Sequence, residues 1–393
     1  MTSSGRGGHW TVIAGYAGVS SANQMLWLTF APVTTVAAAH YGVSESAIGW
    51  LAEIFPLLYV VLAIPAGVAL DRWFRPCLLA GAGLTAGGAV IRLGGGYGWA
   101  LAGQILIAIA QPLVLNALTK VVSGYVAVRS RPTGIAAGSA SVFAGMVLAL
   151  LLGSILDRGS DLPLLLGISA GYSALAAVAL AVALCRPPSF DVAITAAGLQ
   201  RLRAVWADPV IRTVTGLSLA GFGVFVAMTT WLQALLEPAG IPASTAGVLL
   251  LEMVLAGIIG SALLPAWVVR SHATARFLRG VVLVTAVGCL ALAAFPRVGV
   301  AAVALFAIGA GLLTALPVLL EIVERRAGDS GATAAALLWM AGNAGGLVVA
   351  LAVQVLLDRP AWAFTCMAVA VLAALPLTTP ARLGSGLARS PAG

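Results

Sequence analysis

Long apolar runs separated by short polar turns make up almost the whole chain. The runs fall at about 10–38, 47–70, 77–93, 99–122, 133–156, 162–185, 210–236, 243–269, 277–295, 298–322, 330–356 and 361–379. Each run is long enough, or nearly so, for a helix that crosses the hydrocarbon core of a bilayer, which takes about 20 residues. The pattern therefore predicts an all-α membrane protein with twelve transmembrane helices.

The two halves of the chain share landmarks about two hundred residues apart. The run at 47–70 contains one carboxylate, Glu53, and Glu252 stands 199 residues later in an equivalent run. The tripeptide Leu-Asp-Arg at 156–158 recurs at 357–359, an offset of 201 residues. Offsets that change so little over half the chain indicate a duplicated gene, and hence two pseudo-symmetric six-helix halves.

The longest polar stretch separates the two sets of six runs. It extends from Arg186 to Asp208 and contains two consecutive prolines, which disfavour a continuing helix. We therefore expect an N-terminal six-helix half at 1–185, a cytoplasmic linker at 186–209 and a C-terminal six-helix half at 210–393.

Composition supports a membrane protein and excludes several other classes. Hydrophobic residues make up 61% of the chain and charged residues 9%, with a mean hydropathy of +1.05, whereas soluble domains carry about 25% charged residues. The net charge of +8 comes from basic residues scattered along the turns, so no basic stripe indicates a nucleic-acid partner. The four cysteines lie about a hundred residues apart, which is not the spacing of a metal or redox site. No metal and no other cofactor is expected.

Lys and Arg accumulate on the cytoplasmic side of membrane proteins, so their distribution predicts the topology. With the N-terminus inside, 17 of the 21 Lys and Arg residues fall in cytoplasmic turns or tails. Both termini are therefore expected in the cytoplasm, as an even number of helices requires. The chain is rich in Ala, Gly and Arg and poor in Lys, which is typical of a GC-rich bacterial genome and predicts a place in the cell (inner) membrane.

The turn after the second apolar run carries a charged motif. Its residues are Gly67, Asp71, Arg72 and Arg75, in the pattern G-x-x-x-D-R-x-x-R. Together with the six-plus-six layout, this motif resembles the signature of the major facilitator superfamily. The resemblance implies a transporter that works by alternating access, in which these residues clasp neighbouring helices on the cytoplasmic side and favour the outward-open state. The alternative interpretation, from the residues alone, is a positive-inside loop with one acid.

Several helices also resemble one branch of that superfamily, the relatives of the feline leukaemia virus subgroup C receptor. The shared stretches are Asn23-x-x-x-Trp27, 111–125, Pro317 to Glu324 and Leu337 to Asn343. Members of the branch carry haem, choline or ethanolamine, so the resemblance implies a substrate of this kind and assigns Trp27 and Asn343 to its site. The chain departs from the branch in two places, because no Gln stands in the fifth helix near 141–145 and Asn343 replaces a Gln in the eleventh.

Two carboxylates lie inside predicted spans. Glu53 is about six residues into the second helix, and Glu252 lies at a similar depth in the eighth. An ionisable group inside a span costs several kcal/mol unless it faces a cavity or a partner, so each is a candidate for proton coupling or cation binding. The alternative is a structural hydrogen bond or salt bridge, for Glu53 with Arg92.

Three tryptophans are candidates for contact with a ligand. An indole face attracts an organic cation or amine, by up to about 2 kcal/mol in a dry site, and Trp27 and Trp339 each have amide side chains one helical turn away. Apolar packing is the alternative for both of them. For Trp231, about five residues from its helix end, the alternative is the interfacial aromatic belt. The candidate substrate-binding residues are Asn23, Gln24, Trp27, Trp231, Trp339 and Asn343.

A second set of charges lies near the cytoplasmic end of the tenth helix. Glu321 and Glu324 stand there, and Arg325 follows directly. Neighbouring acids and bases favour ion pairs that distinguish one transport state from another. We therefore group these three residues with the charged motif after the second helix as gating candidates.

The sequence best fits a secondary transporter that binds a small molecule near the bilayer midplane between its halves. We expect a small organic cation or amine such as choline or ethanolamine, and proton-coupled export of drugs or metabolites is the alternative. The sequence contains no Walker motif, catalytic triad or metal cluster, so neither an ATPase nor an enzyme is expected. A membrane sensor and an enzyme of lipid metabolism are alternatives from other classes. The expected partners are the small-molecule substrate and the lipid bilayer, with no nucleic acid, and we expect a monomer.

Overall fold

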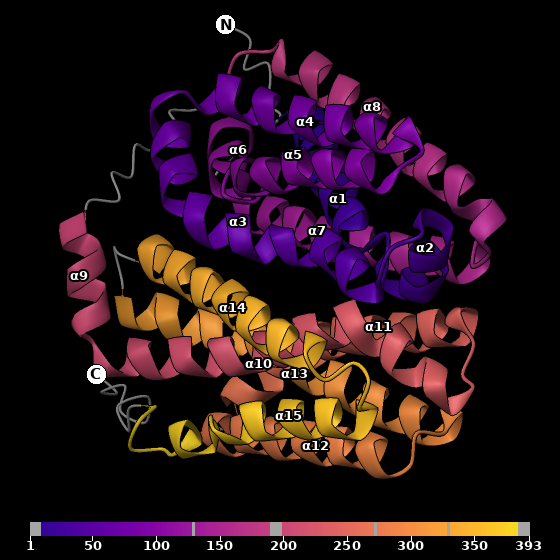
Figure 1. Cartoon of the computed structure of the whole chain (residues 1–393). Coiled ribbons are helices and arrows are strands. Elements are labelled where there is room, and N and C mark those ends of the chain that lie inside the picture. The colour runs from indigo at the N-terminus through magenta and orange to yellow at the C-terminus, as the bar shows by residue number, and fades with distance from the viewer. Residues whose placement is uncertain (1–8, 128–129, 189–198, 271–272, 328–330, 384–393) are drawn as a thin grey trace, which may run out of the picture. The chain divides into compact units, whose positions relative to one another are not determined.

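The computed structural model describes residues 9–127, 130–188, 199–270, 273–327 and 331–383. Every regular element in these ranges is a helix (Figure 1). The chain divides into two compact units. Unit 1 contains residues 1–30 and 36–196, and unit 2 contains residues 31–35 and 197–393.

Unit 1 is an antiparallel bundle of long helices, drawn from indigo to magenta in Figure 1. Its α-helices are α1 (Trp10–Leu28), α2 (Thr34–Tyr41, which begins in unit 2), α3 (Glu45–Arg72), α4 (Phe74–Ile91), α5 (Tyr97–Leu115), α6 (Leu118–Tyr125), α7 (Arg131–Ile155) and α8 (Leu162–Leu184). Two 3-10 turns, η2 (Arg92–Gly94) and η4 (Gly159–Asp161), lie at helix ends.

Unit 2 has the same kind of architecture. Its α-helices are α9 (Leu199–Ala207), α10 (Pro209–Leu236), α11 (Ala243–Arg270), α12 (Thr274–Ala294), α13 (Val298–Ala327), α14 (Gly331–Gln354) and α15 (Pro360–Leu372). Its 3-10 turns are η1 (Ala31–Val33), η5 (Glu237–Ala239) and η7 (Leu375–Thr378).

The chain is a multi-pass membrane protein. Eleven helices in the described ranges are long and apolar enough to cross a membrane, against the twelve that the sequence predicts. The helix that falls short is α1, although it has 19 residues. Its apolar sequence is interrupted by the polar side chains of Ser20, Ser21, Asn23 and Gln24, which lower its hydropathy. The same polar residues are the reason why α1 matters for a site.

A short segment between α1 and α2 belongs to unit 2, although the sequence around it builds unit 1. The turn η1 packs against α10 and α11. Thr35 N donates to Gln233 Oε1 at 2.7 Å, and Gln233 Nε2 donates back to Thr35 Oγ1 at 2.7 Å. These two reciprocal hydrogen bonds with one buried glutamine fix the segment to α10.

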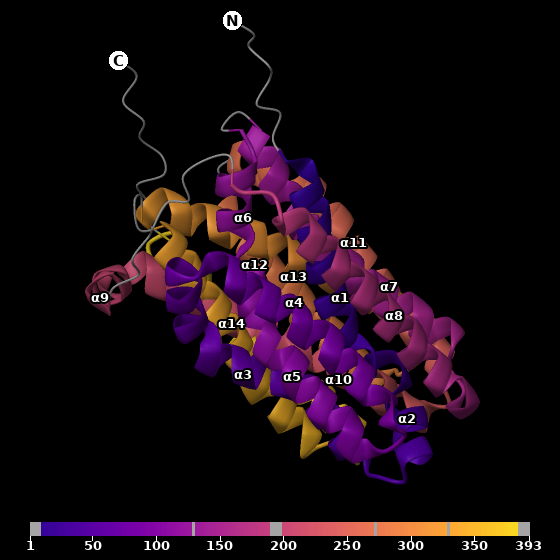
Figure 2. The same cartoon turned by 90° about the horizontal axis from the view of Figure 1, so that it is seen from above.

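The two units pack their helices in the same way, as the duplication predicts. In unit 1, α1 packs on α7 and α8, α4 on α5, and α3 on α5. In unit 2, α10 packs on α14 and α15, α12 on α13, and α11 on α13. The pairs of unit 2 can be followed in Figure 1, and α1 with α7 and α8 of unit 1 in Figure 2. This repeated arrangement gives each long helix of unit 1 a counterpart in unit 2.

Glycines set the closest helix crossings at matching places. A Cβ on Gly145 of α7 would collide with the backbone carbonyl of Ser21 on α1. A Cβ on Gly345 of α14 would collide with the backbone carbonyl of Leu219 on α10. Only a residue without a side chain permits such an approach of two helix backbones.

We expect Gly345→Ala to destabilise the protein. In an open helix this change would stabilise by up to about 1 kcal/mol, but here the new methyl group meets backbone that cannot move away, which costs about 1–3 kcal/mol. The melting temperature of the purified variant in detergent should therefore fall. The control is Gly167→Ala, where a Cβ meets no atom within 4 Å. Equal melting temperatures for Gly345→Ala and the wild type would contradict the close crossing.

Candidate functional site

The polar residues of α1 lie inside unit 1. The Asn23 amide nitrogen donates to Thr85 Oγ1 on α4 at 3.4 Å and to the carbonyl oxygen of Ile107 on α5 at 3.1 Å. The Gln24 amide nitrogen donates to Asn23 Oδ1 at 3.5 Å. Both side chains are buried. Asn23 therefore ties three helices together, and Gln24 orients it.

The Trp27 indole bridges α1 and α3. Its Nε1 donates to the carbonyl oxygen of Ala52 at 3.2 Å, and its ring centroid lies 6.4 Å from that of Phe55 at an interplanar angle of 35°. The side chain is 3% exposed. These contacts are of the kind that the apolar-packing alternative predicts. They also bring the indole to the turn of α3 that carries Glu53, which is itself fully buried.

A buried cation stands at the end of α4. Arg92 is 1% exposed, and its guanidinium donates to Gln104 Oε1 at 3.1 Å, to the carbonyl oxygen of Leu26 at 3.3 Å and to Thr29 Oγ1 at 3.4 Å. The Gln104 amide nitrogen donates in turn to the carbonyl oxygen of Leu51 at 2.9 Å. Arg92 and Gln104 thus join the ends of α1, α3 and α5 through backbone carbonyls. Sequence analysis did not predict a role for Gln104, although a lone glutamine in an apolar run indicates a buried hydrogen-bond network.

The candidate residues of unit 2 lie on α10, α11 and α14. Trp231 is fully buried, and its Nε1 donates to the carbonyl oxygen of Ala350 at 3.0 Å, so it lies within the bundle and not in an interfacial belt. Trp339 is half-buried, and Asn343 Nδ2 donates to its carbonyl oxygen at 2.9 Å. Glu252 is partly buried on α11.

The Trp339 ring has an aromatic neighbour on α10. The Phe222 ring meets it edge-on, with centroids 5.9 Å apart and an interplanar angle of 83°. Phe222 in turn lies 5.6 Å from Phe225. The half-buried indole is therefore held by a neighbouring helix, with part of its surface still accessible.

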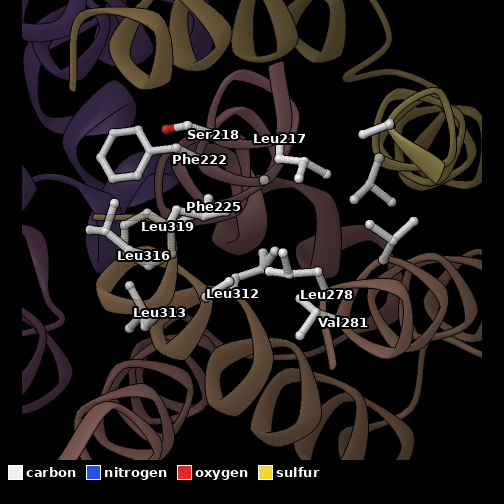
Figure 3. A pocket seen from close by; sticks show the side chains of 15 residues that line it. Leu217, Ser218, Phe222, Phe225, Leu278, Val281, Leu312, Leu313, Leu316 and Leu319 are labelled. Atoms are coloured by element: carbon white, nitrogen blue, oxygen red, sulfur yellow. The ribbon is translucent and has the colours of Figure 1, made fainter. Parts of the chain in front are cut away.

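Phe222 also lines a pocket inside unit 2. The side chains that line it come mainly from α10, α12, α13 and α15 (Figure 3). Ser218 is the one polar side chain among the residues that line it, and its hydroxyl donates to the carbonyl oxygen of Leu338 at 3.1 Å. The lining residues are Leu217, Ser218, Gly221, Phe222, Phe225, Leu278, Val281, Val282, Leu312, Leu313, Ala315, Leu316, Leu319, Val371 and Ala374. An apolar pocket with its one hydroxyl satisfied does not fit a charged amine.

The structure describes three of the four residues of the charged motif at the end of α3, namely Gly67, Arg72 and Arg75. Arg75, on the first turn of α4, donates to the carbonyl oxygen of Leu184 at the end of α8. The Arg72 guanidinium lies 4.8 Å from the centroid of the exposed Trp73 ring. A Cβ on Gly67 would meet no atom within 4 Å. The side chain of Asp71 lies outside the described part of the structure, as do those of Glu324 and Arg325 near the end of α13, where Glu321 is partly buried.

A family model described as Major Facilitator Superfamily matches residues 16–350. The chain belongs to this superfamily. A bacterial homolog to the human lysosomal transporter Spinster, in an inward-facing and unoccupied conformation, is similar to it with a TM-score of 0.74 and 16% identity, over 100% of both chains. At this identity the likeness shows the shared superfamily fold alone.

Curated relatives within the superfamily are more similar in sequence. Solute carrier family 49 member A3 of Danio rerio is 31% identical over 311 residues, which is 72% of this chain and 64% of the relative. The chain thus spans less than two thirds of that relative's length. The choline/ethanolamine transporter FLVCR2 of Homo sapiens is 27% identical over 119 residues, which is 29% of this chain and 23% of the relative. The narrower resemblance seen in the sequence is confirmed by these matches.

Sequence analysis of this superfamily member did not find an ion pair at the start of α10. Asp208 caps the helix by accepting from Val210 N at 2.8 Å, and Arg326 Nε donates to Asp208 Oδ2 at 2.7 Å. Burial alone would raise the pKa of Asp208, but the hydrogen bonds from Arg326 and from the backbone outweigh it, so the pKa lies below its ordinary value. The sequence Asp-Pro at the start of an apolar run is a recognisable signal for the start of a helix. The sequence gives no signal for the pairing of Asp208 with Arg326, which is 118 residues away.

We expect the stabilising effect of Asp208 to disappear at low pH. Because the folded-state pKa is lowered, the carboxylate stabilises the folded state above its unfolded pKa of about 3.9 and loses this effect as the pH falls through the folded-state pKa. Asp208→Asn keeps a good capping residue and removes the charge. An exposed pair is worth at most about 1 kcal/mol, so a small melting-temperature difference between the two proteins at pH 7 should shrink as the pH is lowered toward about 3. A difference that grows toward low pH would contradict the pair.

Among the described residues, no group of three or more His, Cys, Asp or Glu side chains could hold a metal ion. The candidate site residues instead form two sets, each within one unit. Asn23, Gln24, Trp27 and Glu53 belong to the α1–α3 side of unit 1. Trp231, Trp339 and Asn343 belong to the α10–α14 side of unit 2.

Proposed function

We propose that the protein is a secondary transporter that moves a small organic cation or amine, such as choline or ethanolamine, across the membrane by alternating access. Membership of the superfamily over residues 16–350 supports transport. The match to a relative named as a choline/ethanolamine transporter supports the substrate class. The matching helix packing of the two units supports alternating access, because transporters of this kind are built from structural repeats.

Trp339 is the main cation-binding residue of the proposed substrate site. A cation-π contact needs an accessible ring face, and Trp339 is the candidate tryptophan that keeps part of its surface open while Phe222 holds its edge. Asn343, one turn along α14, supplies an amide whose nitrogen is bound to the Trp339 carbonyl and whose oxygen can accept from an ammonium or hydroxyl group. Trp231, fully buried, would act by supporting α14 at Ala350.

Within unit 1, Glu53 on α3 is the proposed counter-charge for a cation. Glu53 is fully buried beside Ala52, whose carbonyl oxygen orients Trp27. A carboxylate held at this depth attracts an organic cation that reaches it, and the desolvated setting strengthens the attraction. Glu252 of α11 would have the same role in unit 2. Asn23 and Gln24 position α1, so that Trp27 meets the turn that carries Glu53.

The charged cytoplasmic residues are proposed to control the change of state. Arg75 ties α4 to the end of α8, which supports a clasping role for the motif of Gly67, Asp71, Arg72 and Arg75. We assign Glu321, Glu324 and Arg325 the corresponding role at the end of α13. Both sets lie at helix ends, the first where α3 ends and α4 begins and the second in the last turns of α13.

A thermal-shift screen tests the substrate class. The purified protein is heated with choline, ethanolamine, haem, polyamines and cationic drugs at pH 6 and pH 8. A ligand that binds only the folded state raises the melting temperature by mass action. We expect a quaternary or protonated amine to stabilise the wild type and to have less effect on Trp339→Ala. Stabilisation by haem alone, or by none of these compounds, would contradict the proposal.

Proton-coupled export of drugs or metabolites is the second candidate, because Glu53 is fully buried on α3 and such an acid can exchange a proton. The two candidates differ in their response to a pH gradient. Strict dependence of flux on the gradient favours the proton-coupled exporter, whereas flux that follows the substrate gradient alone favours a facilitator of organic cations.

A further inference from the structure

The duplication assigns positions of unit 1 a counterpart in unit 2. The glycine crossings align Ser21 of α1 with Leu219 of α10, an offset of 198 residues. Gly88 of α4 and Gly288 of α12 each face an isoleucine of the next helix, an offset of 200 residues. The two isoleucines, on α5 and α13, are 201 residues apart. These offsets allow one face of unit 1 to be compared directly with the matching face of unit 2.

In unit 1 the matching face is a packed core. Val19, Leu78, Ala82 and Val114 are buried in one cluster there, together with Tyr16. At the offsets above, the counterparts of the first four line the pocket of unit 2: Leu217, Leu278, Val282 and Ala315. The same positions thus fill a core in one unit and line an open space in the other.

Two positions on α10 have smaller side chains than their counterparts on α1. Tyr16 of α1 corresponds to Val214, and Asn23 corresponds to Gly221, which lines the pocket. Asn23 also donates to a threonine of α4, and the counterpart of that threonine, Thr285, is buried with no hydrogen-bond partner for Oγ1 among the described residues. At these two positions α10 therefore lacks the ring and the amide that α1 carries.

The lining determines what the pocket can hold. Apart from Ser218, whose hydroxyl is bound to Leu338, its walls are aliphatic and aromatic side chains and one glycine. Figure 3 shows the rings of Phe222 and Phe225 on one side and the aliphatic side chains of Leu278 and Val281 on the other. Water gains no hydrogen bonds in such a space, whereas a hydrocarbon group gains contacts on every side. The ligand that fits is a hydrocarbon chain.

The bilayer around the protein contains such chains. Two of the helices that wall the pocket, α12 and α15, expose aliphatic side chains on their outer faces, among them Val287 and Val369. In a membrane protein these faces contact lipid chains. We propose that the pocket of unit 2 binds the acyl chain of a membrane phospholipid, at a site separate from the proposed substrate site.

Photolabelling tests this site without a transport assay. The wild-type protein is reconstituted with a phosphatidylcholine that carries a diazirine in its acyl chain, irradiated and mapped by mass spectrometry. We expect labels on Phe225 and Leu312, which are buried in the pocket wall, in addition to lipid-facing residues such as Val287. Labels on the lipid-facing residues alone would contradict the proposal, as would labelling of the pocket by a free diazirine alkane and not by the lipid.

Two filling variants and a matched control make the test specific. Gly221→Leu fills the pocket from α10 and Ala315→Leu fills it from α13. Each should lower labelling of Phe225 by about tenfold. The added side chain takes the place of about two methylene groups of the bound acyl chain, and losing their burial weakens binding by about this factor. Gly280→Leu is the control, because a Cβ on Gly280 meets no atom within 4 Å and the residue does not line the pocket. If one filling variant fails to fold, the other decides. Unchanged labelling in a folded filling variant would overturn the proposal.

Discussion

Replacement of Glu53 by Gln should strongly reduce uptake of an organic cation while the protein still folds. Gln has nearly the same shape as Glu and can form hydrogen bonds, so packing at this fully buried position on α3 is kept. The variant loses the negative charge that would balance a bound cation or exchange a proton. A charge-assisted interaction is worth about 1.5–3 kcal/mol, so a loss of uptake of about tenfold to a hundredfold is expected. Initial rates in proteoliposomes measure it.

Glu237→Gln is the matched control for this experiment. Glu237 is exposed on η5 at the end of α10, so removal of its charge should leave uptake unchanged. The melting temperatures of both variants report whether they fold. Wild-type uptake by a folded Glu53→Gln protein would contradict a role for this acid and would favour the structural alternative.

Replacement of Trp339 by Ala should weaken substrate binding more than any other single aromatic change. In a desolvated site, the contact of a cation with the indole face contributes up to about 2 kcal/mol to the free energy of binding. This contribution corresponds to about thirtyfold in affinity. Trp339→Phe keeps a ring against Phe222, which the indole meets edge-on, and should retain part of the affinity. The KM for uptake should therefore rise in the order wild type, Phe variant, Ala variant.

The control for Trp339 is a tryptophan that faces away from the bundle. Trp362 on α15 is 63% exposed, so Trp362→Ala should leave the KM unchanged. A rise in KM that is the same for Trp339→Phe and Trp339→Ala would favour a packing role, because both variants lose the shape of the indole. An unchanged KM in both would remove Trp339 from the site.

Much of the fold could be predicted from hydrophobic runs and repeats. Long apolar runs require helices, because a bilayer leaves no other way to satisfy the backbone of a single segment. The repeat of Glu53 as Glu252 indicated the pseudo-symmetry, and the helix packing of the two units confirms it. The count of spans was less secure, because the polar residues that make α1 interesting also lower its hydropathy.

The partners of the candidate residues could not be predicted. The sequence shows Asn23 as a polar residue on an apolar helix. Its hydrogen bond to the carbonyl oxygen of Ile107 depends on how α1 and α5 are rotated about their axes. A salt bridge between Glu53 and Arg92 was one alternative from the sequence and stays a prediction, but no signal in the sequence indicated the hydrogen bond from Arg92 to Gln104. Such contacts join positions that are distant in sequence, and a single sequence carries no signal for their pairing.

Counterflow of labelled choline and ethanolamine into proteoliposomes tests the central claim most directly. Vesicles loaded with the unlabelled amine are diluted into the labelled one, so that a transporter that alternates between two states exchanges them without an added driving force. The account predicts saturable exchange that Trp339→Ala weakens and Glu237→Gln leaves unchanged. Wild-type protein that folds and inserts but exchanges neither amine faster than empty vesicles would contradict it.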